Sequence, residues 1–482
     1  MAKRKLSTFE RLQPEGLNRQ RRRELGRRIT AGDPGLAVVH PDAAGIDVGN
    51  ASHFVAIPPE RDPVPIREFG SWTAAVQEMA QWVKAHGLRP GALQSTGVYW
   101  LAGQEVLEQA GLEGSLGNAR GTKTLPGRKS DVQECEWLRK RHTSGLLRNS
   151  FRPPAEIRAV RTIWRQRARW VQEAGRMGPH RPKALTTMTG QLANTISDLS
   201  GVTGQAILRA SVAGVRDPWA LAKLRDPRIA ASEAEIAHSW PGHWREEVLF
   251  ELRQRLEAYA FYQQHLAACD RELAKATAAV ASRELPATPE VPAGAAGLPA
   301  ATPARRAKAR RKHHPGVDLA GARHRTMGVD LTRIDGIDVL TAQVIFAELG
   351  PDFAAFPDEQ HFASWLTLAP RHDISGGKVL RRIPAAGRNR VANALRMAAQ
   401  SLSRSNSYLG ARYRRLRARL DGPVAVKAMA RSLACLVYRL GTKGQAYVDH
   451  GAAHYEAKRQ QRERRALERR ASNLGLKLLP AT

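Results

Sequence analysis

Three acidic residues in this sequence have a spacing that could support chemistry on a phosphate ester. Asp47 lies at the end of a predicted strand, and Asp131 and Glu134 are three residues apart behind Ser130, a residue typical of helix N-caps. In a helix, this spacing projects both carboxylates from one face. Together the three would supply the oxygen ligands that Mg²⁺ prefers, and a pair of such ions stabilises phosphodiester transfer. The alternative is a common strand-end Asp and a solvated acidic helix face.

A serine near the other end of the chain could act as a nucleophile. The run Ser375–Lys378 contains a serine, two glycines and a lysine. On an exposed turn, Ser375 could attack a phosphate while Lys378 stabilises the charge that develops. Without further evidence, the same run is an ordinary turn.

Several other positions are candidates for contact with a nucleic acid backbone. Gly336 lies in a predicted helix–turn–helix-like hairpin, where backbone N–H groups at a helix N-terminus could meet a phosphate, although Asp335 and Asp338 add negative charge nearby. Basic clusters precede Asp131 and fill a segment rich in Ala and Pro. The residues predicted to bind nucleic acid are Arg128, Lys129, Gly336, Arg310, Arg311, Lys312 and Lys378.

The overall charge favours a polyanionic partner. The 482 residues include 76 Lys and Arg against 45 Asp and Glu, a formal net charge of +31. Clustered basic residues in such excess are typical of nucleic acid binders, although an Arg-rich composition alone is the alternative. A hydrophobic content of 42% excludes wholesale disorder, and no apolar run approaches a membrane span. Three widely separated cysteines argue against disulfides or a thiolate zinc site. We expect a soluble, cytoplasmic, nucleoid-associated protein.

The patterning predicts an α/β region followed by all-α regions. Short apolar runs at 46–48 and 54–57 predict a β-hairpin, and helices are expected at 72–86 and 102–110. Trp164 and Trp170 flank three arginines, which indicates either a surface for stacking bases or the packing of a helix pair. The predicted organisation is a basic flexible arm (1–40), an α/β domain (41–154), a helical region (155–285), an Ala/Pro-rich basic linker (286–328), a C-terminal helical domain (329–450) and a charged helix (451–482).

Several motifs together resemble the insertion-sequence-110 family of DEDD transposases. They are GIDVG at 45–49, STGVYW at 95–100, PGRKSD at 126–131, ISD at 196–198 with GVTG at 201–204, SGGK at 375–378 and AAQSL at 398–402. The resemblance covers roughly residues 40–475. It implies an N-terminal RuvC-like (ribonuclease-H-type) domain, a helical coiled-coil section and a C-terminal transposase domain.

The resemblance also implies a mechanism and partners. The acidic residues and the C-terminal serine would form one composite centre that uses Mg²⁺. The serine would attack DNA and form a transient phosphoserine link. A structured guide RNA encoded by the element would select donor and target DNA within a dimer of dimers.

Position by position, the resemblance assigns the first family Asp to Asp47, the third acidic position to Asp131 and the nucleophile to Ser375. Two positions differ: Gln94 stands where the family has Glu, and Glu134 stands where it has Asp. Glu134 keeps the negative charge, whereas Gln94 removes one and predicts an impaired or inactive centre. The rival hypothesis is therefore a catalytically inactive nucleic-acid-binding protein derived from such a transposase. A weaker third alternative is an actin-like ATPase, in which an Asp-x-Gly turn after a strand binds phosphate. No second glycine-rich phosphate-binding loop follows this turn in the sequence, which counts against this class.

Overall fold

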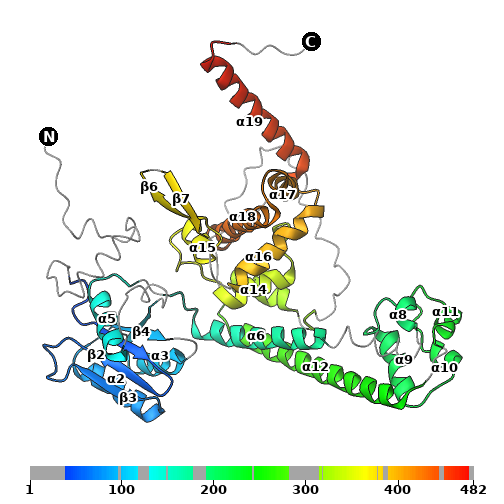
Figure 1. Ribbon diagram of the computed structural model, residues 1–482, viewed down its shortest axis with the longest axis horizontal. Helices are drawn as coiled ribbons and strands as arrows, with labels where there is room; N and C mark the ends of the chain where they lie inside the picture. The colour runs from blue at the N-terminus through cyan, green and yellow to red at the C-terminus, as the bar shows by residue number, and fades with distance from the viewer. Residues whose placement is uncertain are drawn as a thin grey trace. The chain divides into compact units, whose positions relative to one another are not determined.

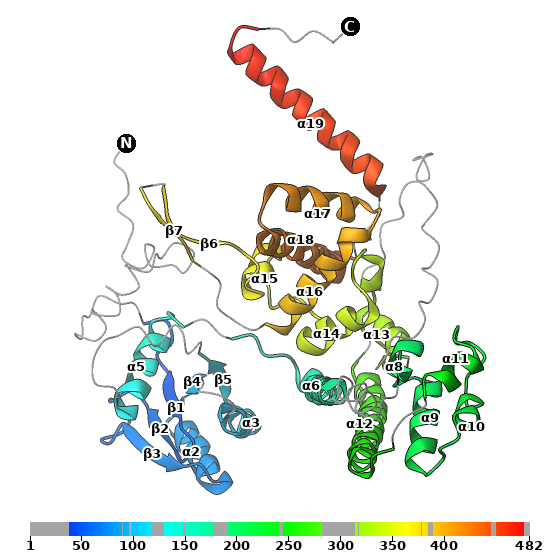
Figure 2. The same cartoon turned by 45° about the vertical axis from the view of Figure 1, so that its right-hand side comes forward.

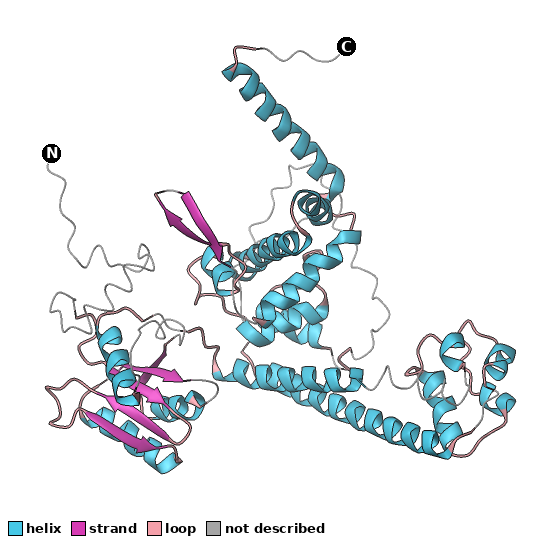
Figure 3. Ribbon diagram, in the orientation of Figure 1, coloured by secondary structure: helices cyan, strands magenta, loops and turns pink. Residues whose placement is uncertain are grey.

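The structure is a computed structural model that divides the chain into two compact units, Met1–Arg152 and Pro153–Thr482. It describes residues 38–88, 90–95, 99–117, 130–147, 150–176, 191–240, 244–281, 314–316, 318–376, 378–383, 389–444 and 450–476. The first unit is α/β and the second is mostly helical (Figures 1 and 3). None of the described helices is long and apolar enough to cross a membrane.

The first unit is built on a five-stranded sheet of order β3-β2-β1-β4-β5. The strands are β1 (Ala44–Val48), β2 (Ser52–Ala56), β3 (Ile66–Gly70), β4 (Pro90–Ser95) and β5 (Glu113–Leu116). The antiparallel pairing of β1 with β2 confirms the predicted hairpin. The central strand β1 is parallel to β4, and β4 is parallel to β5, so the carboxyl ends of these three strands lie at one edge.

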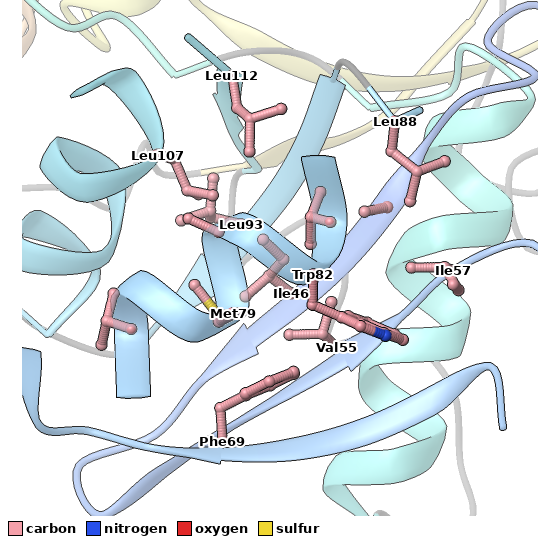
Figure 4. Close-up of a cluster of buried hydrophobic side chains, with 14 of the residues drawn as sticks. Ile46, Val55, Ile57, Phe69, Met79, Trp82, Leu88, Leu93, Leu107 and Leu112 are labelled. Carbon is pink, nitrogen blue, oxygen red and sulfur yellow. The ribbon is translucent and has the colours of Figure 1, made fainter. Parts of the chain in front are cut away.

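Three described helices cover the sheet of the first unit: α2 (Thr73–Ala85), α3 (Trp100–Gln109) and α5 (Asp131–Thr143). The alternation along β1 decides which helix meets which side chain. Ile46 and Val48 belong to the buried cluster formed with α2 and α3, shown in Figure 4. Gly45 instead lies against the backbone of α5, at Cys135 and Arg139. The sheet is therefore packed between α2 and α3 on one face and α5 on the other.

The close approach of α5 to β1 depends on the absence of a side chain at Gly45. A Cβ there would overlap the Cys135 carbonyl oxygen and the Arg139 amide nitrogen, and these backbone atoms cannot rotate away. We expect Gly45→Ala to destabilise the protein by about 3 kcal/mol, an overpacking cost, as measured by urea unfolding. Gly103→Ala is the control because a Cβ at that helical position meets nothing within 4 Å. Equal stability of the two variants would contradict this packing.

The second unit begins with two long helices that lie side by side, α6 (Ala155–Arg176) and α12 (Glu246–Ala278) (Figures 1 and 2). Trp170 packs against Phe261, Tyr262 and His265 of α12. The segment that contains Trp164, Trp170 and three arginines therefore packs a pair of helices. This is the second of the two interpretations that the sequence allowed, the first being a surface for stacking bases. Between these helices in the chain, a separate hydrophobic core joins α8 (Leu192–Thr195), α9 (Val202–Val212), α10 (Pro218–Ala222) and α11 (Glu233–His238) to the start of α12.

The rest of the second unit is a helical bundle. Its helices are α13 (Leu319–Met327), α14 (Val339–Leu349), α15 (Glu359–Trp365), α16 (Arg390–Ser401), α17 (Tyr408–Arg419), α18 (Gly422–Lys443) and α19 (Gly451–Asn473), with short 3-10 turns η1 (Leu331–Arg333) and η2 (Leu402–Arg404). Helix α14 packs against both α16 and α6. Its Glu348 binds the Arg165 guanidinium of α6 at 2.6 Å, which ties the long helices to the bundle.

The expectation of a wholly helical C-terminal region was wrong at one place. Strands β6 (Arg371–Ser375) and β7 (Lys378–Ile383) form an antiparallel hairpin. The sequence contains the reason, because a two-glycine turn between short extended segments favours a hairpin. The domain boundaries that we predicted inside the second unit stay predictions.

Candidate functional site

Asp47 is half-buried near the carboxyl end of the central strand β1. It lies two residues from Gly45, on the face of the sheet that α5 covers. Burial raises the pKa of the Cys135 thiol to about 12, and the negative charge of Asp47 contributes to this rise. The Asp47 carboxylate is therefore near Cys135, in the N-terminal half of α5.

The first turn of α5 carries the other two predicted carboxylates. Ser130 caps the helix as predicted, since its hydroxyl accepts the Gln133 N–H at 3.3 Å. Asp131 is exposed and Glu134 is half-buried. Both lie in the first turn, where the positive end of the helix dipole stabilises carboxylates. The acidic pair is thus on the helix that packs against Asp47, at the helix end nearer to it.

The parallel pairing of β1 with β4 places Gln94 directly beside Asp47 in the sheet. Gln94, one of the two positions that differ from the pattern of the family that the sequence resembles, is therefore the backbone neighbour of Asp47. The carboxyl ends of adjacent parallel strands are a common location for ligand-binding residues. Asp47 and the Gln94 position are therefore strand neighbours, and α5 packs against β1 within the same unit.

The described residues do not form a complete metal site. No three Asp, Glu, His or Cys side chains among them are close enough to hold a metal ion. The chemistry of Asp47, Asp131 and Glu134 suits Mg²⁺, because all three supply carboxylate oxygens. Their convergence on an ion stays a prediction, and Arg128 and Lys129, predicted to bind nucleic acid beside them, lie outside the described residues.

Ser375 and Lys378 lie at the tip of the β6–β7 hairpin. They are paired across the two strands, and both side chains are exposed. Gly376 follows the serine with a φ of 56°, a left-handed conformation that glycine adopts without steric cost. Side chains paired across a hairpin are neighbours, so a hydroxyl and an ammonium group are presented together. This arrangement suits attack on an accessible phosphate by the hydroxyl, with the cation close by.

The turn at Gly336 is packed into the bundle. Gly336 has a φ of 91°, and a Cβ there would come within 3.0 Å of the Ala398 carbonyl oxygen and of the Leu402 side chain. The Asp335 carboxylate accepts hydrogen bonds from the hydroxyls of Ser405 and Ser407.

The N-terminus of α14, which begins just after this turn, is capped from within the chain. The Asp338 carboxylate accepts the Thr341 N–H at 2.8 Å. These contacts give the turn a packing role, and its contact with a phosphate stays a prediction. Arg310, Arg311 and Lys312 lie outside the described residues.

One feature of the second unit was absent from the predicted site residues: a basic cleft between α17 and α19. It is lined by Tyr408, Arg415, Arg419, Tyr455, Lys458, Arg459, Arg462 and Glu463. The signal in the sequence is the recurrence of Arg and Lys at helical spacing in both segments, after a tyrosine near the start of each. That spacing alone cannot show that the two helices pack together.

Comparison with known proteins places the hairpin inside a recognised region. Residues 330–414 match the family model described as transposase IS116/IS110/IS902 family. The match supports the resemblance to the insertion-sequence-110 family and a transposase function, with DNA as a partner. It includes Gly336, Ser375 and Lys378, whereas Asp47 and Gln94 lie outside it. No curated protein matches the chain.

Proposed function

We propose that this protein is a DNA transposase that exchanges DNA strands when an insertion sequence moves, with Ser375 as its nucleophile. The observation that carries the proposal is the exposed pair Ser375 and Lys378 at the tip of a hairpin, within the region that matches a transposase family. A hydroxyl at the end of a projecting hairpin is accessible to a substrate as large as DNA. The formation of a covalent link between Ser375 and DNA tests the proposal.

The proposed chemistry is a two-step phosphoryl transfer. The Ser375 oxygen attacks a backbone phosphorus, its proton passes to water, and the bond from phosphorus to one sugar oxygen breaks as that oxygen takes up a proton. A hydroxyl of the recipient strand then attacks the phosphoserine, and the serine leaves with a proton. Lys378 stabilises the negative charge that develops on the phosphate oxygens in both steps.

The resemblance assigns Asp47, Asp131 and Glu134 of the first unit to the same reaction. These carboxylates would hold Mg²⁺, which, when bound, supplies positive charge at the phosphate. The support for this part is the packing of α5, which carries Asp131 and Glu134 in its first turn, against β1, which carries Asp47. Gln94 lies beside them in place of an acidic residue and weakens the site, because an amide oxygen neutralises no cation charge.

The resemblance extends the proposal to the partners. It adds a structured guide RNA that selects donor and target DNA, and a dimer of dimers as the active assembly. The formal net charge of +31 supports nucleic acid partners in general.

Restoring a carboxylate at position 94 is expected to raise the rate. We expect Gln94→Glu to accelerate strand transfer at least tenfold, since each 1.36 kcal/mol of added transition-state stabilisation gives a factor of about ten. The measurement is a strand-transfer assay with the purified protein and its RNA. Gln77→Glu is the control because it adds the same charge at an exposed position of α2, on the opposite face of the sheet from α5. A rate that Gln94→Glu leaves unchanged would show that position 94 does not limit the reaction.

The second candidate function is a nucleic-acid-binding protein that has lost its catalytic activity. One observation favours it: the neutral Gln94 is the strand neighbour of Asp47 in the sheet. Both candidates predict binding that weakens steeply with salt. They differ in the covalent DNA adduct, which only the enzyme forms.

A further inference from the structure

The packing of α17 against α19 creates a cleft in the second unit. Its volume is about 250 Å³. Figures 1 and 2 both show α19 starting beside α17 and continuing beyond it. The backbone joins the two at this end, since the Ala452 N–H donates to the Asn406 carbonyl at 3.3 Å. The cleft therefore lies where the two helices are held together.

The cleft carries more positive charge than the described residues neutralise. Five of its lining side chains are cationic and one, Glu463, is acidic. Glu463 is shared by Arg415 at 3.4 Å and Arg459 at 2.8 Å. Arg419, Lys458 and Arg462 are exposed and form no salt bridge with another described residue. Like charges this close repel one another, so a bound polyanion would stabilise the arrangement.

Aromatic rings lie beside these cations. Tyr408 and Tyr455 are half-buried and meet edge to face, with ring centroids 5.1 Å apart. Lys458 and Arg462 follow Tyr455 on the same face of α19, because they are three and seven residues further along. Tyrosine rings next to a row of cations are the combination that binds an unpaired nucleotide strand, with stacked bases and a backbone that follows the charges. A paired duplex offers its phosphates but not the faces of its bases.

We propose that the cleft between α17 and α19 binds an unpaired nucleic acid strand, with phosphates on Lys458 and Arg462 and a base against Tyr455. Most of the cleft lies beyond the region that matches the transposase family. The inference does not depend on the strand-transfer chemistry, because it concerns binding alone. It can therefore be measured in a chain that cannot react.

The first test compares two pairs of charge-removing substitutions on α19. In the full-length Ser375→Ala chain, Lys458→Gln with Arg462→Gln removes two cations from the cleft, and Arg464→Gln with Arg465→Gln removes two from outside it. Binding of a labelled single-stranded DNA is measured by fluorescence anisotropy at several salt concentrations. The slope of the logarithm of the binding constant against the logarithm of the salt concentration should fall in magnitude by about 1.4 for the cleft pair, about 0.7 for each lost phosphate contact. The other pair should leave it nearly unchanged. Equal losses for both pairs would overturn the proposal.

The second test addresses the tyrosine ring. Tyr455→Leu should weaken binding of single-stranded DNA roughly 5- to 150-fold, the range for loss of one stacked base, whereas Tyr455→Phe keeps the ring and should bind almost normally. Thermal unfolding identifies variants that remain folded. If folded Tyr455→Leu binds like Tyr455→Phe, the assignment of a base to this ring fails.

Other probes in the same assay identify the occupant. Single-stranded RNA of the same sequence should bind as well as the DNA or better. This result supports an unpaired strand as the occupant and shows whether RNA is preferred. Tighter binding of the corresponding duplex DNA overturns the proposal. None of these outcomes bears on the proposed nucleophile, whose test is the covalent adduct formed by the chain with Ser375 intact.

Discussion

Ser375→Ala is expected to abolish the covalent protein–DNA adduct and to reduce strand transfer by a factor of at least about 10³, the scale of loss when an enzyme's nucleophile is removed. The hydroxyl oxygen is the atom that bonds to phosphorus in the proposed first step, and alanine has no group to replace it. The exposed position at a hairpin tip makes a folding defect an inadequate explanation for such a loss. The measurement is a strand-transfer time course, with the adduct followed on a denaturing gel.

Ser364→Ala is the matched control for this substitution. Ser364 is also exposed and also lies in the region that matches the transposase family. It should retain the wild-type rate and adduct. DNA binding by Ser375→Ala should stay within about twofold of wild type, because one neutral hydroxyl contributes little to backbone affinity. Strand transfer that survives Ser375→Ala would remove the serine from the mechanism.

Asp47→Asn is expected to slow strand transfer on the order of 10²- to 10³-fold. The amide has nearly the same shape, so the substitution removes the negative charge and leaves the packing of β1 against α5 intact. Loss of several kcal/mol of charge stabilisation in the transition state gives a decrease of this size. The Asp47 carboxylate should contribute more than Glu134, because it is held at the centre of the sheet, whereas Glu134 lies in a terminal helical turn.

The control for Asp47→Asn is Asp42→Asn, which makes the same change at a residue paired with Arg61 in the same unit. Asp42→Asn should keep the wild-type rate. Asp47→Asn should bind DNA as tightly as wild type or more tightly, since a negative charge has been removed. A rate within a few-fold of wild type for Asp47→Asn would show that the strand-end carboxylate has no part in the reaction.

Local signals in the sequence predicted several elements of the first unit, but not strands β3 and β5. The hairpin at β1 and β2, helix α2 to within one residue at each end, and the Ser130 cap of α5 all depend on neighbouring residues. The register of β1 against β4 was not predictable, because it is set by packing across the sheet. That register is what makes Gln94 the neighbour of Asp47.

The arginines of the second unit show why charge alone misplaces function. Arg167 and Arg165 counted toward a possible nucleic-acid-binding surface in the sequence. In the structure, Arg167 is 4% exposed and pairs with Asp270, whereas Arg165 pairs with Glu348. Arg419, Lys458 and Arg462, which form no salt bridge with another described residue, lie instead on α17 and α19, and only tertiary packing brings these two helices together. Composition gives the total charge, but ion pairing decides how much of it remains for a partner.

The identity of the residue that bonds to DNA tests the central claim most directly. The wild-type protein is incubated with its RNA and a DNA substrate, trapped by denaturation, and digested with protease and nuclease for mass spectrometry. We predict a nucleotide linked through phosphate to Ser375. A linkage at another residue, or strand transfer that proceeds with no linked peptide at any time point, would contradict it.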